Sequence, residues 1–422
     1  MAKIKQIKAR EILDSRGNPT VETIVLLDNG ITGLASVPAG ASLSKYEALE
    51  LRDNDIRRYS GMGVLKAVDN VNNILAPKLI GLDPSKQFDI DTIMIGLDGT
   101  LNKSKLGSNS ILSISLACAV AAANNYRLPL FRYINRLFGQ ALPNTLEKMP
   151  TPTFNIINGG KHGTGNLDFQ EFHIIPASNK PYHEALMIGE EIYQKLKTVL
   201  IYQNAIYSVG DEGGFAPNLA SNLDALEAII MAIKSTRYSF GRDIFLGLDI
   251  ASAQFNKGDG YHLKDLQQPL SATNFIKYLI NLDNQYNLLI LEDPLEEDNL
   301  VGWQTITNAI GMKTLIVGDD FLATNIERIN LAITNKACNA ALIKPNQVGT
   351  LTETLTVIKN ARQGGLKIIV SHRSGETNDT FIADLAVAVA AEYVKFGAPA
   401  RGERIVKYNR LLEIEELLNI NK

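Results

Sequence analysis

The sequence predicts an α/β barrel that follows a smaller α+β domain. Two observations lead to this prediction. Between Asn155 and Thr377, about eight strand-length apolar runs alternate with helix-length segments, as in a parallel sheet covered by helices on both faces. Before residue 138 the order differs, because short alternating runs come first and helical patterns follow them. About eight strands favour a closed barrel over an open sheet.

The N-terminal domain begins with a predicted antiparallel meander. Residues 3–37 alternate short apolar runs with the turn sequences DSRGNP and LDNGITG. Residues 61–138 then have helical patterns, and the segment KLGSNSILSISLACAVAAANNY is apolar or small almost all round, which predicts a buried helix. The polar, proline-containing stretch GQALPNTLEKMPTPT follows. We place the boundary there, with residues 1–138 as the α+β domain and 139–422 as the barrel.

Composition excludes several classes of protein. The 422 residues carry a formal net charge of −3, with 45% hydrophobic and 21% charged residues, so we expect neither disorder nor a nucleic-acid partner. Cys118 and Cys338 have no CxxC motif or nearby histidine, which disfavours a disulfide framework and a zinc site. The most apolar helical stretch, ILSISLACAVAAA, is shorter than the ~20 residues of a membrane span. We therefore expect a cytoplasmic protein without a membrane span.

Five of the predicted barrel strands end on a chemically reactive side chain. These residues are Asp249, Glu292, Asp319, Lys344 and His372. In such a barrel the carboxyl ends of the strands meet at one mouth, where active sites lie, so we expect the five groups to share a cavity. A polar residue also ends many strands simply at the solvent boundary. Because the five side chains combine carboxylates, an amine and an imidazole, we favour the interpretation that they share a cavity.

The three acidic residues suit a hard metal ion. Asp249, Glu292 and Asp319 offer carboxylate oxygens only, which are the ligands that Mg²⁺ prefers. Without a cation, three clustered carboxylates repel one another and some must take up protons. Asp293 and Asp320 are either outer-shell partners of these ligands or solvated loop carboxylates.

Lys344 is the predicted base. A nearby divalent cation lowers the pKa of a lysine, which makes the neutral amine available near pH 7. A metal ion with a lysine suits removal of the weakly acidic proton next to a carboxylate, since cations neutralise the charge that develops.

Two glycine-rich segments and one further loop add candidate groups. The sequence SVGDEGGFAPN contains Glu212, and GGKHGTGNLDFQEF contains His162 and Glu171. Glycines let a backbone approach a ligand, although most such pairs mark ordinary turns. The sequence SHRSGE contains Arg373 and Ser374, which together can hold a phosphate group. A structural salt bridge is the alternative role for Arg373.

Several longer motifs resemble one family. The sequences AREILDSRGNPTVE, EALELRD, LDGTLNKSKLG, NIINGG, GDEGGFAPN, GDD, SHRSGET and FIADLAV occur in this order. Together they span about residues 3–418 and closely resemble the enolase family, the phosphopyruvate hydratases of glycolysis. The resemblance implies an enolase-type, TIM-barrel-like α/β barrel with an N-terminal α+β capping domain that carries a lid loop.

The resemblance also implies an activity. Enolases are Mg²⁺-dependent lyases that interconvert 2-phosphoglycerate and phosphoenolpyruvate, with two Mg²⁺ ions in each active site. By this resemblance the chain binds a small phosphorylated substrate and forms a homodimer or a larger homo-oligomer.

The resemblance assigns a role to each matching residue. Lys344 would remove the C2 proton, and Glu212 would be the acid that assists departure of the C3 hydroxyl. Ser42, in the loop PAGASLSK, would close over the substrate and bind the second Mg²⁺. The first Mg²⁺ would be held by Asp249, Glu292 and Asp319. The implied substrate-binding residues are His162, Glu171, His372, Arg373, Ser374 and Lys395, with Arg373 and Ser374 on the phosphate and Lys395 on the carboxylate.

The chain departs from the family pattern in the lid and around the pocket. The usual PSGASTG reads PAGASLS here, with Ala39, Leu43 and Ser44 at the changed positions. Loss of the glycine restricts the backbone and predicts slower or differently shaped lid closure. Phe396 replaces a threonine beside Lys395, which predicts a narrower pocket. Gln254 replaces a carboxylate that follows the first metal ligand.

A further departure concerns oligomerisation. Glu413 reverses a charge that in relatives pairs across the dimer with the position of Glu22, and Arg410 is a candidate substitute. Two alternatives to the leading function remain open: an enolase relative that acts on a phosphonate analogue, and a non-catalytic or moonlighting binding protein on the same fold.

Overall fold

The N-terminal part of the chain contains a three-stranded antiparallel sheet. The computed structural model describes residues 2–40, 44–139, 148–163 and 167–419. β1 (Ile4–Leu13) pairs with β2 (Pro19–Leu27), and β2 pairs with β3 (Thr32–Ser36). The predicted meander is therefore confirmed.

Several helices follow this sheet. They are α1 (Leu65–Asp69), a π-helix (Asn70–Leu75), α2 (Ala76–Leu79), α3 (Gln87–Asp98), α4 (Ser108–Asn125) and α5 (Leu130–Phe138), after a short 3₁₀ helix (Tyr59–Gly61). Of these, α1, the π-helix, α2 and α4 pack against the strands of the sheet. α4 is buried along almost its whole length, as predicted, and packs directly on β2 and β3. A Cβ atom on Gly33 would lie 2.3 Å from the Ala117 carbonyl oxygen, so this close approach requires glycine.

No single helix in the described part of the chain is both long and apolar enough to cross a membrane. α4 and α5 together reach that length and composition, but they are bent by 108° relative to each other.

The second part of the chain is a closed barrel of eight strands in the order β10-β11-β4-β5-β6-β7-β8-β9. The strands are β4 (Thr151–Asn158), β5 (Glu171–Pro176), β6 (Ile244–Asp249), β7 (Ile290–Glu292), β8 (Leu315–Gly318), β9 (Ala340–Ile343), β10 (Lys367–Ser371) and β11 (Tyr393–Lys395). The predicted barrel is confirmed. The predicted range for its strands was too short, because β4 begins before Asn155 and β11 lies after Thr377.

One strand runs against the others. β5 pairs antiparallel with both β4 and β6, so the expectation of an entirely parallel sheet was wrong. The connection explains this direction: the described residues between β4 and β5 contain no α-helix, and a strand that returns without a crossover helix lies antiparallel to its predecessor. Two helices then separate β5 from β6.

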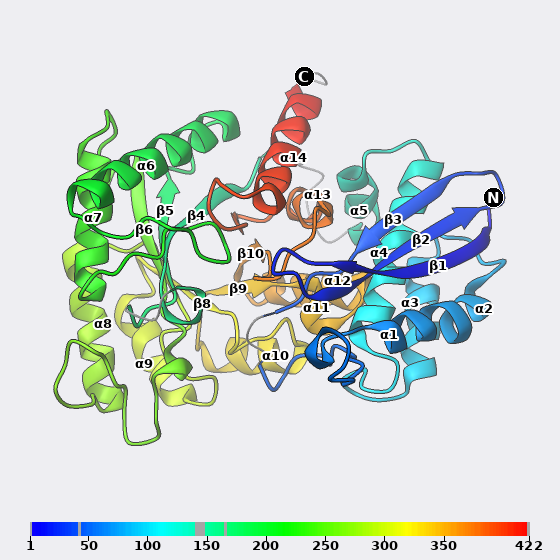
Figure 1. Cartoon of the computed structure of the whole chain (residues 1–422), viewed down its shortest axis with the longest axis horizontal. Coiled ribbons are helices and arrows are strands. Elements are labelled where there is room, and N and C mark those ends of the chain that lie inside the picture. The colour runs from blue at the N-terminus through cyan, green and yellow to red at the C-terminus, as the bar shows by residue number, and fades with distance from the viewer. Residues whose placement is uncertain (1, 41–43, 140–147, 164–166, 420–422) are drawn as a thin grey trace.

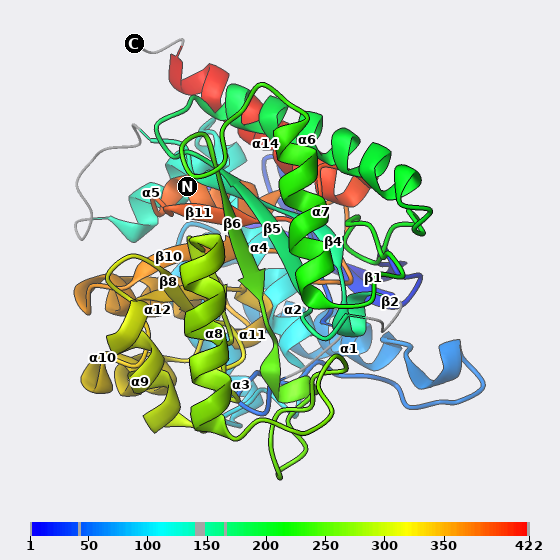
Figure 2. The ribbon, with the colours of Figure 1, turned by 90° about the vertical axis from the view of Figure 1, so that its left-hand side faces the viewer.

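Helices surround the barrel, as the view in Figure 2 shows for α6 to α9. They are α6 (Tyr182–Tyr202), α7 (Asn222–Lys234), α8 (Ala272–Tyr286), α9 (Leu300–Ile310), α10 (Ile326–Asn335), α11 (Pro345–Val348), α12 (Leu351–Gln363), α13 (Phe381–Ala388) and α14 (Gly402–Asn419), with 3₁₀ turns at Gly160–His162 and Ser252–Gln254. Several of them begin at a side-chain cap. Ser221, Ser271 and Thr350 each accept a hydrogen bond from the backbone N–H three residues on, which stabilises the first helical turn.

The N-terminal domain lies beside the barrel (Figure 1), with α5 against α13 and α3 against α12. After β3 the chain crosses to the mouth of the barrel, where Ala39 forms a backbone bridge with Gly375. Residues 44–47 therefore lie next to the loops at the carboxyl ends of the barrel strands. The division into residues 1–138 and 139–422 stays a proposal.

Candidate active site

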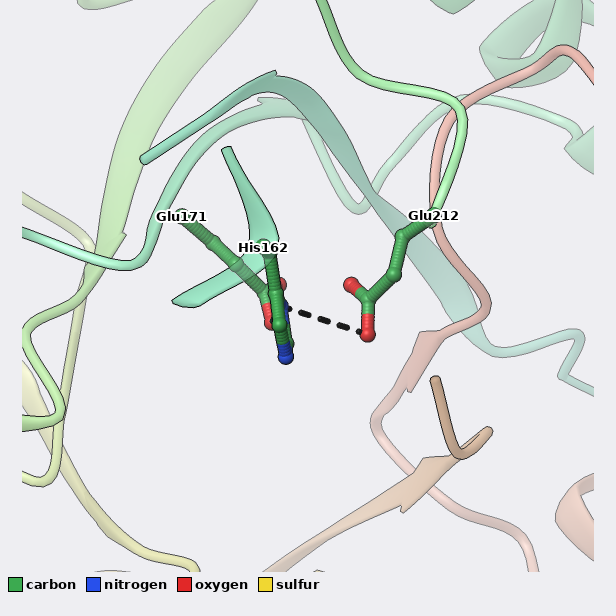
Figure 3. Close-up of side chains that lie close together, drawn as sticks. All are labelled: His162, Glu171 and Glu212. Carbon is green, nitrogen blue, oxygen red and sulfur yellow. Dashed lines mark ion pairs between the residues drawn. The ribbon is translucent and has the colours of Figure 1, made fainter. Parts of the chain in front are cut away.

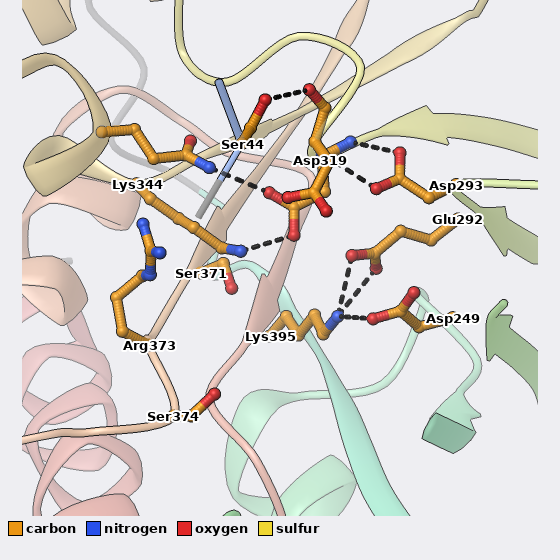
Figure 4. Close-up of polar contacts among 12 residues, drawn as sticks. Ser44, Asp249, Glu292, Asp293, Asp319, Lys344, Ser371, Arg373, Ser374 and Lys395 are labelled. Carbon is orange, nitrogen blue, oxygen red and sulfur yellow. Dashed lines mark hydrogen bonds and ion pairs between the residues drawn. The ribbon is translucent and has the colours of Figure 1, made fainter. Parts of the chain in front are cut away.

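The carboxyl ends of the barrel strands surround a small polar cavity. Asp249 ends β6, and Asp319, Lys344 and His372 directly follow β8, β9 and β10. All four line the cavity. Glu292 ends β7 but does not line the cavity. Its carboxylate accepts a hydrogen bond from Lys395, which does line the cavity (Figure 4).

Lys395 lies among the predicted metal ligands. Its Nζ is 2.9 Å from Asp249 Oδ2 and 2.8 and 2.9 Å from the two carboxylate oxygens of Glu292. Burial and then the neighbouring Asp249 carboxylate raise the pKa of Glu292 well above its usual range. The predicted contact between Lys395 and a substrate carboxylate stays a proposal.

These carboxylates fit a hard cation. They present only oxygen donors, and the Lys395 ammonium between Asp249 and Glu292 shows that their positions stabilise positive charge. Mg²⁺ prefers such donors.

Lys344 forms a part-buried ion pair with Asp319 Oδ2. Gln347 Nε2 donates a hydrogen bond of 3.1 Å to the other oxygen of the same carboxylate. Burial lowers the pKa of Lys344, but the negative charge of Asp319 outweighs it and the net shift is upward. The predicted lowering of this pKa therefore requires a cation on Asp319 that offsets its charge.

Asp293 positions the strand end that carries Asp319. Its two carboxylate oxygens accept hydrogen bonds from the backbone N–H groups of Asp319 at 2.9 Å and Asp320 at 2.8 Å. Asp293 is buried, so the solvated-loop alternative is wrong for it, and its outer-shell role stays a proposal. Burial and then the charge of Asp319 raise the pKa of Asp320 to about 7.

A histidine and two glutamates form a second group at the mouth (Figure 3). His162 Nδ1 lies 3.4 Å from Glu171 Oε1 and 3.5 Å from Glu212 Oε1. Burial and the Glu171 carboxylate raise the pKa of Glu212, but the nearby His162 and His372 outweigh them and hold it well below its usual range. Glu212 is thus a carboxylate in this arrangement.

Sequence analysis missed two residues that hold these glutamates. His173 Nε2 lies 2.8 Å from Glu171 Oε2, and Asn155 Nδ2 donates to Glu212 Oε2 at 3.0 Å. His173 could have been found, because residues two apart on a strand point to the same face and Glu171 was already a candidate. Asn155 lies in the motif NIINGG but shows its role only once the barrel closes.

Arg373 makes a buried ion pair with the N-terminal domain. Its Nη1 is 2.8 Å from Glu47 Oε2, and Glu47 Oε1 accepts hydrogen bonds from Ser44 N at 3.1 Å and Gln347 Nε2 at 3.4 Å. The structural salt bridge considered for Arg373 is therefore present, and its phosphate-binding role stays a proposal. Glu47, which sequence analysis missed, links Arg373 to the Gln347 that also holds Asp319.

The loop after β10 is fixed by a buried arginine that sequence analysis also missed. Arg404 Nη1 donates to His372 Nδ1 at 2.7 Å and to the Arg373 carbonyl oxygen at 2.7 Å. Its Nη2 donates to the Ser374 carbonyl oxygen at 2.6 Å. This loop holds Ser374, whose Oγ contacts both His162 and Glu212.

Two residues that depart from the family pattern, Phe396 and Gln254, lie near the cavity but do not line it. Phe396 is fully buried and packs against Tyr408 with ring centroids 5.9 Å apart. It does not line the cavity, so the expected narrowing was wrong: Lys395 ends β11 and lines the cavity, whereas Phe396, just after the strand, packs on Tyr408. Gln254 donates to Gln170, which in turn donates to Asp249 Oδ2 at 3.2 Å.

The changed lid residues are only partly described. Ser44 Oγ contacts the Asp320 carbonyl oxygen at 3.0 Å and Glu297 Oε2 at 3.2 Å. Ser42, the proposed ligand of a second Mg²⁺, and Leu43 lie outside the described residues.

The charged residues predicted to bear on oligomerisation pair within the chain. Arg410 Nη1 lies 2.8 Å from Glu413 Oε2 and Arg410 Nη2 lies 2.8 Å from Asp384 Oδ1, while Arg10 Nε donates to Glu22 at 2.6 Å. Homodimerisation therefore stays a proposal.

A barrel mouth that joins clustered carboxylates, a lysine and a histidine–glutamate group defines a metal-assisted acid–base site. Two family models match the chain: "Enolase, N-terminal domain" over residues 4–134 and "Enolase, C-terminal TIM barrel domain" over residues 146–421. The chain belongs to the enolase family. Membership supports an Mg²⁺-dependent lyase of the enolase type.

Proposed function

We propose that the protein dehydrates 2-phosphoglycerate to phosphoenolpyruvate, and catalyses the reverse hydration. The observation that carries this proposal is Lys344, whose side chain is only 12% exposed and which pairs with Asp319 at the edge of the carboxylate cluster. A lysine base beside a cation-binding cluster suits removal of a proton next to a carboxylate. The enzyme would act in the cytoplasm, in glycolysis and gluconeogenesis.

Asp249, Glu292 and Asp319 would hold one Mg²⁺, and Ser42 would contribute to a second. When bound, Mg²⁺ neutralises the negative charge that develops on the substrate carboxylate.

The protein groups would divide the two proton transfers between them. Lys344 takes the proton from C2, the electrons of that C–H bond form the C2–C3 double bond, and the C3 hydroxyl leaves as water with a proton from Glu212. Because Glu212 is ionised in this arrangement, it must gain a proton before dehydration. In the hydration direction the ionised carboxylate is ready to accept a proton from the attacking water.

The remaining residues would bind the substrate. Arg373 and Ser374 would hold the phosphate, and Lys395 the carboxylate. His162, Glu171 and His372 would complete the contacts around the reacting carbons, since all three line the cavity with Glu212.

The substrate is tested by ³¹P nuclear magnetic resonance. Enzyme with Mg²⁺ is incubated with 2-phosphoglycerate and, separately, with its phosphonate analogue. We expect conversion of 2-phosphoglycerate to an equilibrium mixture with phosphoenolpyruvate. Conversion of the phosphonate alone would replace this function with the divergent alternative, and conversion of neither by folded protein would favour a non-catalytic binding role.

A further inference from the structure

The buried guanidinium of Arg404 contacts His372 behind the cavity. Arg404 lies near the start of α14 and has no exposed surface, and His372 lines the cavity together with Glu212. We propose that Arg404 is a positioning residue of the lyase site. It fixes His372 as a neutral ring with its proton on Nε2, so that this N–H donates toward Glu212 and toward a substrate oxygen in the cavity.

The hydrogen bond between Arg404 and His372 sets the tautomer of the ring. Arg404 Nη1 lies 2.7 Å from His372 Nδ1. A guanidinium has donors only, so Nδ1 must accept this bond with its lone pair. A proton on Nδ1 would set two N–H groups against each other. The ring proton is therefore on Nε2, and the ring is neutral.

Nε2 of His372 is the ring atom that faces the proposed acid. It lies 3.4 Å from Glu212 Oε2, beyond the usual ~2.7–3.2 Å of an N–H···O hydrogen bond. It has no hydrogen-bond partner among the described residues. A buried N–H group without a partner is costly, so this donor is available to an acceptor that enters the cavity. An oxygen of the substrate meets that requirement.

Two further contacts hold the ring in this orientation. The backbone N–H of His372 donates to the Lys395 carbonyl oxygen at 2.9 Å. Gly397, with a φ of +86°, packs closely behind the ring. A Cβ atom there would lie 3.0 Å from His372 Cε1 and 3.1 Å from Arg404 Cδ, so the backbone at Gly397 leaves both side chains little room to move.

Arg404 uses its charge on uncharged acceptors. The four N–H groups of Nη1 and Nη2 go, at 2.7, 2.7, 3.0 and 2.6 Å, to His372 Nδ1 and to the carbonyl oxygens of Arg373, Asp211 and Ser374. The carboxylate of Glu403 is 3.4 Å from Nε. Burying a charge without a close opposite charge costs stability, so we infer that the charge of Arg404 acts on His372.

The charges that face the ring favour its neutral form. Burial lowers the pKa of His372; the Glu212 carboxylate opposes this shift, the Arg404 charge adds to it, and the net pKa is below its usual value. Arg404 therefore acts on the ring from the Nδ1 side, and Glu212 opposes it from the Nε2 side.

The other charged groups around the ring have less influence on it. Glu171 raises the pKa of His372 less than Glu212 does. His162 contacts Oε1 of Glu212, the oxygen that His372 does not face, at 3.5 Å (Figure 3). Lys395 directs its ammonium to Glu292, at 2.8 Å from Oε1.

The role of Arg404 in the reaction rests on the proposed function. Glu212 must gain a proton before the hydroxyl leaves, and an imidazolium at His372 would hold Glu212 in its ionised form. A neutral ring supplies an N–H donor without a full positive charge. Arg404 thus keeps the proposed acid usable without contacting the reacting atoms.

The test is long-range ¹H–¹⁵N nuclear magnetic resonance of protein labelled in its histidine rings, without substrate. His372→Gln identifies the His372 signals among the five histidines. We expect the neutral Nε2–H tautomer in the unchanged protein at about pH 7, above the usual histidine pKa of about 6.5. An imidazolium or an Nδ1–H tautomer there would overturn the proposal, and this result requires no Arg404 variant to fold.

Substitution of Arg404 tests the cause of the tautomer. In Arg404→Met the ring should take up a second proton at a higher pH than in the unchanged protein, because the opposing charge is lost while the Glu212 carboxylate remains. Arg404→Lys keeps the charge, so its ring should take up that proton at a lower pH than in Arg404→Met. Protonation of His372 at the same pH in all three proteins would contradict the proposal.

A second buried cation on α14 provides the matched control. Lys407 pairs with Glu376 at 2.9 Å and donates to the Thr377 carbonyl oxygen at 2.9 Å, so it supports the same loop without the bond to His372. Lys407→Met should keep the His372 tautomer and the pH at which the ring is protonated. An equal change in Lys407→Met and Arg404→Met would reduce Arg404 to a general support of the fold.

Kinetics connects the tautomer with the reaction. Arg404→Met should lower formation of phosphoenolpyruvate by roughly 10- to 100-fold, a smaller loss than removal of the acid itself. Altered protonation of the ring with unchanged product formation would remove Arg404 from the reaction. A tautomer that depends on Arg404, in a protein that does not convert 2-phosphoglycerate, would instead leave the positioning contact standing and remove the proposed function.

Discussion

Lys344→Ala is expected to lower turnover of 2-phosphoglycerate by roughly 10²- to 10⁴-fold and to abolish exchange of its C2 proton with solvent. The variant removes the amine proposed to take that proton and leaves Asp319 in place with its bond from Gln347. Exchange is followed by proton nuclear magnetic resonance in ²H₂O, in which the C2 signal disappears.

A second lysine variant controls for the loss of an ion pair. Lys313 also pairs with a buried aspartate, at 2.8 Å from Asp283, but lies outside the barrel mouth. Lys313→Ala should keep both exchange and turnover. If Lys344→Ala exchanges the C2 proton at the unchanged rate while circular dichroism shows an intact fold, Lys344 is not the base.

Glu212→Gln is expected to separate the two proton transfers. The amide cannot deliver a proton to the leaving hydroxyl, so formation of phosphoenolpyruvate should fall by roughly 10²- to 10⁴-fold. Exchange of the C2 proton should continue, because Lys344 is unchanged. Both rates are measured on one sample, from the C2 proton signal and the product signal.

The outcome distinguishes the proposed roles. Loss of exchange together with product would mean that Glu212 does not act as a separate acid and instead supports the whole site. Asn155→Ala is a useful companion, since it removes the 3.0 Å hydrogen bond to Glu212 Oε2 without changing the carboxylate. Its effect should be smaller and confined to product formation.

The barrel could be predicted from the sequence because most of its strands lie within apolar runs that alternate with helix-length segments. The reversed direction of β5 could not, since an apolar run has the same pattern in either direction. β11 was missed because the three residues of Tyr393–Lys395 are too short to show a period.

Some residues of the candidate site could likewise be predicted from the sequence, and others could not. Asp249, Glu292, Asp319 and Lys344 could be predicted because each ends an apolar run. Glu47 and Arg404 could not, because their partners are distant in the chain and depend on packing between domains or around the closed barrel. Phe396 was misplaced because it directly follows the end of β11, where its ring packs on Tyr408 in α14 rather than in the cavity.

The central claim is tested most directly by asking whether formation of phosphoenolpyruvate requires Mg²⁺. The measurement is the ultraviolet absorbance of phosphoenolpyruvate after 2-phosphoglycerate is added with Mg²⁺, and again after a chelator. We predict a rise that the chelator stops and that renewed Mg²⁺ restores. A rise that continues in excess chelator, or no rise from folded protein with Mg²⁺, would contradict an Mg²⁺-dependent 2-phosphoglycerate lyase.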